Sequence, residues 1–147
     1  MKILKVDANK KRYMDLLLLA DEQENMIDAY LERGTMYVLE QDGPIAVCVV
    51  TDEDDGVLEI KNIAVKPACQ RMGYGKAMID FIIRQYGNTY RILQVGTGDV
   101  PEAKAFYEKC GFRLSHRKEN FFTDNYDHPM YEGGIQLVDM IYLTLNL

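Results

Sequence analysis

A short glycine-containing segment, residues 70–76, has residue types suited to binding a phosphate or pyrophosphate group. An apolar run with the composition of a strand precedes it, and a helical pattern follows it. Where a strand passes through a glycine loop into a helix, unpaired backbone N–H groups and the positive end of the helix dipole point at one place. Gly73 and Gly75 carry no Cβ, so the backbone can approach an anion, while Arg71 and Lys76 add positive charge.

The two common phosphate-binding loops do not fit this segment. The loop of P-loop nucleotide-binding proteins needs a Ser or Thr after its lysine and a glycine five positions before it. Here Ala77 follows Lys76, and Arg71 stands at the earlier position. The dinucleotide fingerprint needs a third glycine where Met78 stands. A nucleotide-binding protein that uses the same loop stays open as an alternative.

The spacing that remains, Gln70-x-x-Gly73-x-Gly75, resembles the Q/R-x-x-G-x-G/A signature of the GNAT family of N-acetyltransferases. Residues 105–112 resemble the family's second signature, FYxKxGF. The segment from residue 121 to 140 is similar to that of an uncharacterised bacterial subgroup. The resemblance implies an enzyme that moves the acetyl group of acetyl-CoA directly to a primary amine of a small molecule, a peptide or a protein. A non-catalytic acyl-CoA-sensing or protein-binding module with the same fold is the second alternative.

The resemblance also implies where the cofactor binds. In the family the glycine loop holds the pyrophosphate, and main-chain groups of the preceding strand bind the pantetheine arm and the acetyl carbonyl. The expected cofactor-binding residues are Ile63, Ala64, Val65, Gln70, Arg71, Met72, Gly73, Tyr74, Gly75, Lys76, Asp99 and Tyr107. Asp99 is interpreted as a helix cap first and a cofactor contact second, because its charge is unfavourable beside phosphates.

Two side chains fit the proton transfers that this reaction requires. A primary amine with a pKa of ~10.4 must lose a proton to attack, and the departing thiolate must gain or share one. Glu59 resembles the position of the family's glutamate base and would act through a water, although an outward-facing strand carboxylate is the alternative. Tyr107 matches the family's usual acid, and a phenol pKa of ~10 is near a thiol's ~8.5.

The acetyl acceptor is not identified by the sequence. Carboxylates and aromatic rings that could hold a cation occur in two segments that commonly border the acceptor site in the family. These residues are Glu22, Glu24 and Asp28 in the first segment, and Asp124, Tyr126, Asp127, Tyr131, Glu132 and Asp139 in the second. A solvated acidic surface is the alternative interpretation of each one.

The composition sets broad limits on the protein. With 147 residues, of which 48% are hydrophobic, we expect residues 1–147 to form a single domain. The formal net charge of −6 argues against nucleic acid as the main partner. An acidic surface suits a cationic substrate, and the alternative is that it only keeps the protein soluble. Three widely spaced cysteines without a C-x-x-C pattern indicate neither disulfides nor a zinc site, so no metal is expected.

No long apolar segment occurs at the N-terminus, and no run approaches the ~20 residues of a membrane span. We therefore expect a cytoplasmic protein with no membrane partner. A homodimer would fit as well, because the final strands leave a sheet edge that can pair.

The order of the predicted elements indicates a mixed α/β sheet flanked by helices, with a three-strand meander at its centre. It is also the order of the GNAT fold, in which the strand before the glycine loop and the strand after the following helix separate, and the pantetheine arm lies in the gap. The predicted strands are 2–6, 35–40, 44–51, 57–65, 91–95, 112–116 and 135–147, and the predicted helices are 8–20, 21–33, 76–85 and 99–110.

Glycines and caps mark the predicted boundaries of these elements. Gly34 is expected as the C-terminal cap of the second helix, and residues 41–43 as a hairpin turn. Residues 96–98 are expected as a loop, and residues 120–134 as an irregular segment. Asp99 and Glu102 have the spacing of a capping box at the start of the helix that carries Tyr107.

Overall fold

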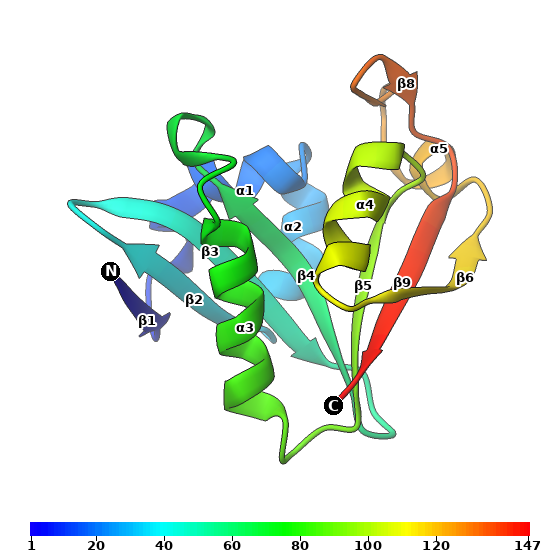
Figure 1. The fold of residues 1–147 in the computed structure, drawn as a ribbon. Coiled ribbons are helices and arrows are strands. Elements are labelled where there is room, and N and C mark those ends of the chain that lie inside the picture. Colours follow the sequence, from blue (N-terminus) through cyan, green and yellow to red (C-terminus); the bar gives the residue numbers. More distant parts are fainter.

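The computed structural model, which describes residues 1–147, contains a seven-stranded mixed sheet with helices on both faces (Figure 1). The strand order is β1-β2-β3-β4-β5-β9-β6, and β7 and β8 form a separate hairpin. The strands are β1 Lys2–Val6, β2 Thr35–Glu40, β3 Pro44–Asp52, β4 Val57–Val65, β5 Ile92–Gly98, β6 Arg113–Lys118, β7 Tyr131–Glu132, β8 Ile135–Gln136 and β9 Met140–Asn146. The predicted fold class is confirmed.

Helices α1 and α2 cover one face of the sheet, and α3 and α4 cover the other (Figure 1). The helices are α1 Met14–Ala20, α2 Glu24–Leu31, α3 Tyr74–Tyr86, α4 Pro101–Lys109 and α5 Phe121–Asn125, with 3₁₀ turns at Lys10–Tyr13 and Pro67–Cys69. None of these helices has the length and apolar character needed to cross a membrane.

Strand alternation produces two hydrophobic cores, one on each face of the sheet. In β2, Tyr37 and Leu39 pack with α3, whereas Met36 and Val38 pack with α1 and α2. The inner strands are therefore buried on both faces, as the apolar run in β3 shows. This burial fixes β4, the strand that leads to the glycine loop, between two packed layers.

Strands β4 and β5 pair in parallel only at their beginning, from Val57 opposite Ile92 to Ile60 opposite Val95. A register shift in the β3–β4 ladder then leaves Lys61 without a paired residue in β3. Beyond this bulge β4 continues along β3, while β5 continues along β9. The expected separation of these two strands is therefore present, and it opens a gap in the middle of the sheet.

Residues 96–98 are not the predicted loop, because they form the last part of β5 and pair with β9. The glycines there allow close packing rather than a turn. A Cβ on Gly96 would lie 2.6 Å from Met140 Sδ, and a Cβ on Gly98 would lie 2.5 Å from Leu137 Cδ2. The contacts come from a segment about forty residues away, which a local pattern does not reveal.

Two predicted helix caps are also wrong. Helix α4 begins after Val100, with no side-chain cap, and the Asp99 carboxylate instead pairs with Lys104 at 2.9 Å and Arg117 at 3.4 Å. Helix α2 ends at Leu31, before the predicted cap at Gly34. Gly34 is required by close packing, since a Cβ there would lie 2.7 Å from a methyl carbon of Val49.

The predicted long final strand is broken into two parts. Ile135–Gln136 pairs with Tyr131–Glu132 across the turn at Gly133 and Gly134, both with positive φ, and β9 begins only at Met140. The segment expected to be irregular contains α5 and β7. In Figure 1 this C-terminal hairpin and the loop before α3 both lie at the upper end of the molecule.

Candidate active site

A cleft of about 710 Å³ opens where β4 and β5 separate. Its walls come from the end of α1, the second half of β4, the glycine loop, the end of β5, helix α4 and the C-terminal segment. One end therefore contains the loop predicted to bind phosphate. The other end contains the α1–α2 junction and the segment after α5.

The glycine loop ends at a helix N-terminus with free backbone donors. Helix α3 begins at Tyr74 after Gly73, whose φ is 89°, and no side chain caps it. The N–H groups of its first turn have no partner within the helix, so they are available to an anion. Gln70 Nε2 donates to the carbonyl oxygen of Val65 at 3.0 Å, which ties the loop to the end of β4.

The two cations of the loop form only exposed ion pairs. Arg71 contacts Glu102 at 3.4 Å, and Lys76 contacts Asp80 at 3.0 Å. Exposed pairs of this kind contribute little to stability, about 0–1 kcal/mol. Both side chains can therefore turn toward a bound phosphate at small cost.

The free edge of β4 offers main-chain groups to the gap. The Lys66 N–H donates to Ile45 in β3, so the alternation of an antiparallel ladder turns the main-chain groups of Val65 and Ile63 toward the cleft. Both residues line the cleft together with Ala64. An extended ligand could pair with this edge much as an added strand would.

Tyr107 lies on α4, lines the cleft and is 8% exposed. Its ring packs edge to face against Phe106 and Phe112, which fixes its position. Burial raises the pKa of the Tyr107 hydroxyl above the ordinary value, and the nearby Glu132 carboxylate adds to this effect. The raised pKa keeps the hydroxyl protonated, and because it makes no hydrogen bond to another residue it can donate to a ligand.

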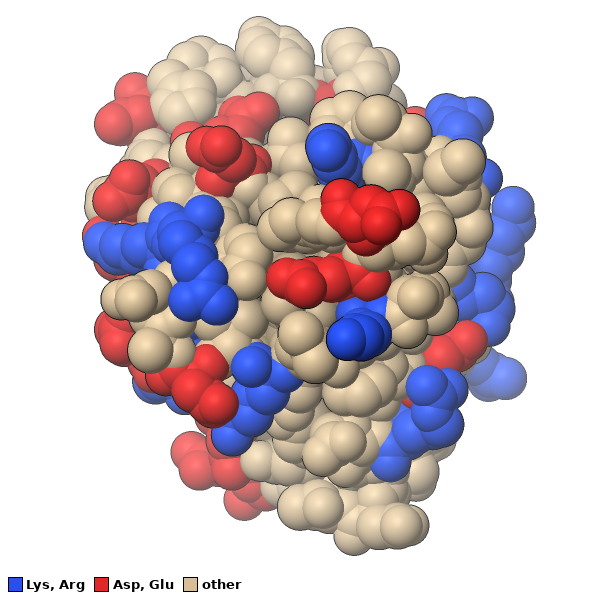
Figure 2. All heavy atoms as spheres, turned by 90° about the vertical axis from the view of Figure 1, so that its left-hand side faces the viewer, with Lys and Arg blue, Asp and Glu red and all other residues tan.

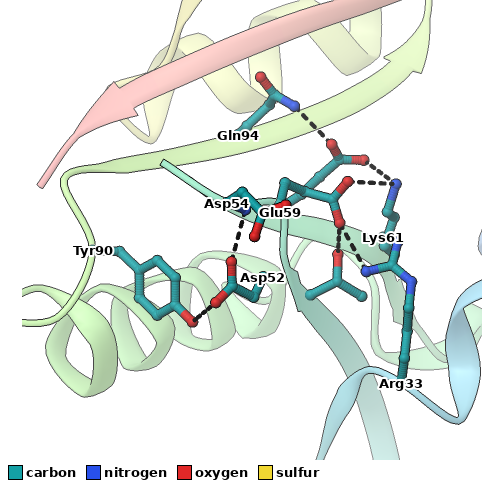
Figure 3. Close-up of polar contacts among 9 residues, drawn as sticks. Arg33, Asp52, Asp54, Glu59, Lys61, Tyr90 and Gln94 are labelled. Carbon is teal, nitrogen blue, oxygen red and sulfur yellow. Dashed lines mark hydrogen bonds and ion pairs between the residues drawn. The ribbon is translucent and has the colours of Figure 1, made fainter. Parts of the chain in front are cut away.

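Glu59 lies beside the cleft rather than in its lining. Its carboxylate is bound on both sides, by Lys61 Nζ at 2.8 Å and by Gln94 Nε2 at 2.7 Å (Figure 3). Lys61 also approaches Glu53 at 3.9 Å, and Glu53 pairs with Arg33 at 3.0 Å. Glu59 thus belongs to a charged network, and of its members only Lys61 lines the cleft.

Most of the predicted cofactor-binding residues are brought together by the structure. The residues that line the cleft are Ile63, Ala64, Val65, Gln70, Arg71, Gly73, Tyr74, Gly75, Lys76 and Tyr107. Met72 and Asp99 do not line it: Met72 is 68% exposed, and the Asp99 carboxylate is occupied by Lys104 and Arg117. Gly75 lies so close to Phe106 of α4 that a Cβ would be 3.1 Å from that ring.

The opposite end of the cleft is acidic and aromatic. Of the acceptor-site candidates from the sequence, Glu22, Tyr126, Tyr131 and Glu132 line it. Burial, with smaller effects of Glu102 and Glu22, raises the pKa of Glu132. The other candidates lie elsewhere: Glu24 and Asp28 contact Lys11, Asp127 contacts His128, Asp139 contacts Arg117, and Asp124 is exposed.

Asp21 and Asn62 are cleft residues that sequence reasoning missed. The Tyr126 hydroxyl donates to Asp21 Oδ1 at 2.6 Å, and the Tyr30 hydroxyl donates to Asp21 Oδ2 at 3.2 Å. Asn62 Nδ2 in turn donates to the Tyr30 hydroxyl at 3.1 Å. No local pattern marks Asp21, because an aspartate between two helical segments is ordinarily a cap.

Acidic and basic side chains are interspersed on the face turned toward the viewer in Figure 2. The net charge of −6 is thus not gathered into one continuous area of this face. No group of three or more histidine, cysteine, aspartate or glutamate side chains is arranged to hold a metal ion.

Comparison with known proteins gives the family. Residues 32–114 match the model of the acetyltransferase (GNAT) domain. The uncharacterised N-acetyltransferase YvbK of Bacillus subtilis is 38% identical over 144 residues, which are 96% of this chain and 92% of that protein. The chain belongs to the GNAT family of acetyltransferases. The predictions of the family and of the class of enzyme are confirmed.

Solved structures agree with this assignment. A GNAT family acetyltransferase from Elizabethkingia anophelis with acetyl-CoA bound superposes with a TM-score of 0.93 at 38% identity, covering 99% of this chain and 97% of that one. A Bacillus subtilis acetyltransferase in complex with CoA gives a TM-score of 0.89 at 36% identity, covering 99% and 98%. The cofactor expected from the sequence is thus the one present in these neighbours.

Proposed function

We propose that this chain, acting as a single domain, transfers the acetyl group of acetyl-CoA directly to a primary amine. The observation that carries the proposal is the gap between β4 and β5, with a glycine loop at one end and the Tyr107 side chain in its wall. The two neighbours crystallised with acetyl-CoA or CoA support the cofactor.

The residues present fit acetyl-CoA. The N-terminal donors of α3, with Arg71 and Lys76, suit a pyrophosphate, and the free main-chain edge at Ile63 and Val65 suits the amide groups of pantetheine. When bound, acetyl-CoA supplies an activated acetyl group as a thioester. The main-chain N–H of Ile63 or Val65 would donate to the thioester oxygen as negative charge develops on it.

Proton movement is assigned to two side chains. Glu59 takes the proton of the amine through a water, because its carboxylate lies outside the lining of the cleft. Tyr107 donates to the sulfur as the C–S bond breaks and the new C–N bond forms. Since burial raises the pKa of Tyr107, this donation stabilises the leaving thiolate as a hydrogen bond before the proton moves. Overall, an ammonium and the thioester give an amide, a thiol and one released proton.

Two further properties belong to this proposal. The three cysteines are free, which fits a reducing compartment such as the cytoplasm. Strand β6 is an edge strand whose residues are all exposed, so it could pair with a second copy to make a homodimer.

The first experiment is a comparison of melting temperatures with acetyl-CoA, CoA, ATP and NAD at one concentration. A ligand at ~100 times its dissociation constant stabilises by ~2.7 kcal/mol, which raises the melting temperature by roughly 5–10 °C here. A rise with the CoA compounds alone supports the proposal. A rise with ATP or NAD alone would mean that the loop binds the phosphates of a nucleotide other than CoA.

The second experiment follows CoA thiol release with a panel of primary amines. Release that depends on the amine, and that falls strongly in Tyr107→Phe, supports acetyl transfer. Tight binding of acetyl-CoA without release for any amine or peptide would instead indicate the acyl-CoA-sensing module.

A further inference from the structure

The Asp21 carboxylate is held in a fixed orientation at the acceptor end of the cleft. Tyr30, from α2, donates to one of its oxygens, and Tyr126, from the segment after α5, donates to the other. The two tyrosines come from elements far apart in the chain. Asp21 itself lines the cleft between the end of α1 and the C-terminal segment.

No cation of the chain pairs with Asp21, in contrast to Glu59, Asp99 and Asp139. Glu59 pairs with Lys61 at 2.8 Å, Asp99 with Lys104 at 2.9 Å, and Asp139 with Arg117 at 2.8 Å. A partly buried carboxylate without a counter-ion is costly unless something else offsets its charge. The two hydroxyl groups occupy two of about four acceptor positions on a carboxylate, so Asp21 can still accept from a further donor.

The cations that line the cleft are already matched with other carboxylates. Lys61 is bound to Glu59, Arg71 to Glu102 and Lys76 to Asp80. Burial raises the pKa of Asp21 in spite of the lowering effect of its hydrogen bonds from Tyr126 and Tyr30. The carboxylate therefore has an environment that a positively charged ligand would stabilise.

Asp21 makes no direct hydrogen bond to β4. It reaches the strand only through the Tyr30 hydroxyl and the Asn62 amide, by hydrogen bonds of 3.2 and 3.1 Å. The thioester would lie against the main chain of β4, beyond Asn62. The carboxylate is thus placed to contact a group farther along the acceptor than the attacking nitrogen. An ion pair with the attacking nitrogen would also oppose the reaction, because it would favour the protonated amine.

The part of the cleft wall that the C-terminal segment forms is apolar and aromatic. Phe122, Met130 and Leu137 are buried side chains that line the cleft, and Tyr126 stacks on Phe122. Such a wall suits the methylene groups of a short alkyl chain. At the rim, Glu22 and Glu132 add negative charge that also favours a cation.

We propose that Asp21 is a specificity-determining residue, which binds a second cationic group of the acceptor and so selects a diamine over a monoamine of the same length. This inference rests on the proposed acetyl transfer and deepens it. Tyr126 and Tyr30 are positioning residues that hold the carboxylate toward the cleft.

The test compares diaminobutane with butylamine, which has the same carbon chain without the second cation. CoA release is measured at one pH for the wild type, Asp21→Asn and Asp15→Asn. Asp15 is an exposed carboxylate of α1 that does not line the cleft, so it controls for the loss of one negative charge. We expect the wild type and Asp15→Asn to prefer the diamine by about tenfold or more in kcat/KM. Asp21→Asn should lose this preference through a higher KM for the diamine, with butylamine nearly unaffected.

Tyr126→Phe keeps the test valid if Asp21→Asn fails to fold. It removes the donor at 2.6 Å and leaves the carboxylate, so we expect a folded protein with a reduced preference for the diamine. The inference is overturned if the wild type uses both amines equally, or if a folded Asp21→Asn or Tyr126→Phe protein keeps the full preference. If no amine of any kind causes CoA release, the proposed function is overturned instead.

Discussion

The two ends of the cleft are built in different ways. The cofactor end comes from one contiguous stretch, the end of β4 with the glycine loop and the start of α3, and it offers mainly backbone groups. The acceptor end is assembled from side chains of the α1–α2 junction, β4, α5 and the segment after α5, with the Asp21–Tyr126 contact spanning 105 positions. The cofactor end follows from the local geometry of one stretch of chain, whereas the acceptor end exists only in the folded chain.

This difference predicts how each end responds to substitution. Backbone donors stay in place whatever the side chains are, so the cofactor end should tolerate most changes except an added Cβ where the chain turns sharply. The acceptor end depends on individual side chains, so single changes there should alter specificity. Tyr107 is a side chain with a proposed role in the chemical step, so its substitution should lower activity whichever end dominates binding.

The largest effect is expected for Tyr107→Phe. Loss of a general acid costs roughly 10²–10⁴-fold in rate, and we expect turnover to fall by about 10³-fold while the Kd for acetyl-CoA changes little. Because burial raises the pKa of Tyr107, the wild-type rate should show no decline from its ionisation up to about pH 10, the ordinary phenol value. Turnover by thiol release and Kd by calorimetry check this expectation.

A control for packing is available in the same aromatic cluster. Phe112→Leu changes a ring that contacts Tyr107 without removing the hydroxyl. It should destabilise the protein, by about 1 kcal/mol, more than it slows the reaction. If Tyr107→Phe turns over as fast as the wild type, the tyrosine has no role as an acid.

The next effect concerns Glu59→Gln and whether this carboxylate serves the chemistry or only the charged network. A proton acceptor should matter most at low pH, where the amine, with a pKa of ~10.4, is almost fully protonated. We expect kcat/KM to fall by about 10²-fold at pH 7 and by much less near pH 10. A rate–pH profile of both proteins measures this difference.

The matched control is Glu53→Gln, which removes another carboxylate near Lys61 that does not line the cleft. Both variants should lower stability, because Lys61 loses one of the two carboxylates that offset its positive charge (Figure 3). Only Glu59→Gln should slow the reaction. A loss that is uniform across pH would assign Glu59 to the positioning of Lys61 rather than to proton transfer.

A smaller effect is expected from Gly73→Ala, which tests the dependence on backbone. Gly73 has a φ of 89° and open space around it, so an alanine there is strained without a clash. The cost to stability is about 1–2 kcal/mol. We expect the KM for acetyl-CoA to rise by about tenfold with little change in turnover, because the strain moves the N–H groups that face the phosphates.

Gly43→Ala is the matched control, with a φ of 111° and open space in the β2–β3 turn, outside the cleft. It should cost similar stability and leave the KM unchanged. Equal effects of both variants on the KM would show that general destabilisation, not loop geometry, governs acetyl-CoA binding.

The same contrast explains how much the sequence could predict. The alternation of apolar residues predicted β1, β2 and β4 with their observed bounds, and the glycine spacing predicted the loop at the end of β4. These features depend on neighbouring residues, which a short pattern contains. Ten of the predicted cofactor-binding residues line the cleft for this reason, although their roles remain predictions.

Several of the failures involve contacts between distant segments. The Asp99 carboxylate pairs with Lys104 of α4 and with Arg117 of β6 instead of capping the helix, and Gly96 and Gly98 pack under Met140 and Leu137. Asp21 becomes a cleft residue only because Tyr126 approaches it from the C-terminal segment. The resemblance to the family suggested that this segment borders the acceptor, but only tertiary structure selects Tyr126 and Glu132 over Asp124 and Asp127.

The smallest effect is expected for Arg71→Ala, at the backbone-built end. The side chain is exposed and forms one weak pair with Glu102 at 3.4 Å, so its removal should not change stability measurably. If the main chain supplies most of the binding to the pyrophosphate, the Kd for acetyl-CoA should rise only about threefold. The salt dependence of the Kd should also become shallower, because one cation no longer faces the phosphates.

Arg113→Ala, in the exposed edge strand β6, removes the same charge away from the cleft and should leave the Kd and its salt dependence unchanged. A loss of a hundredfold or more in Arg71→Ala would show that a side chain dominates this end too, and the contrast between the two ends would then fail.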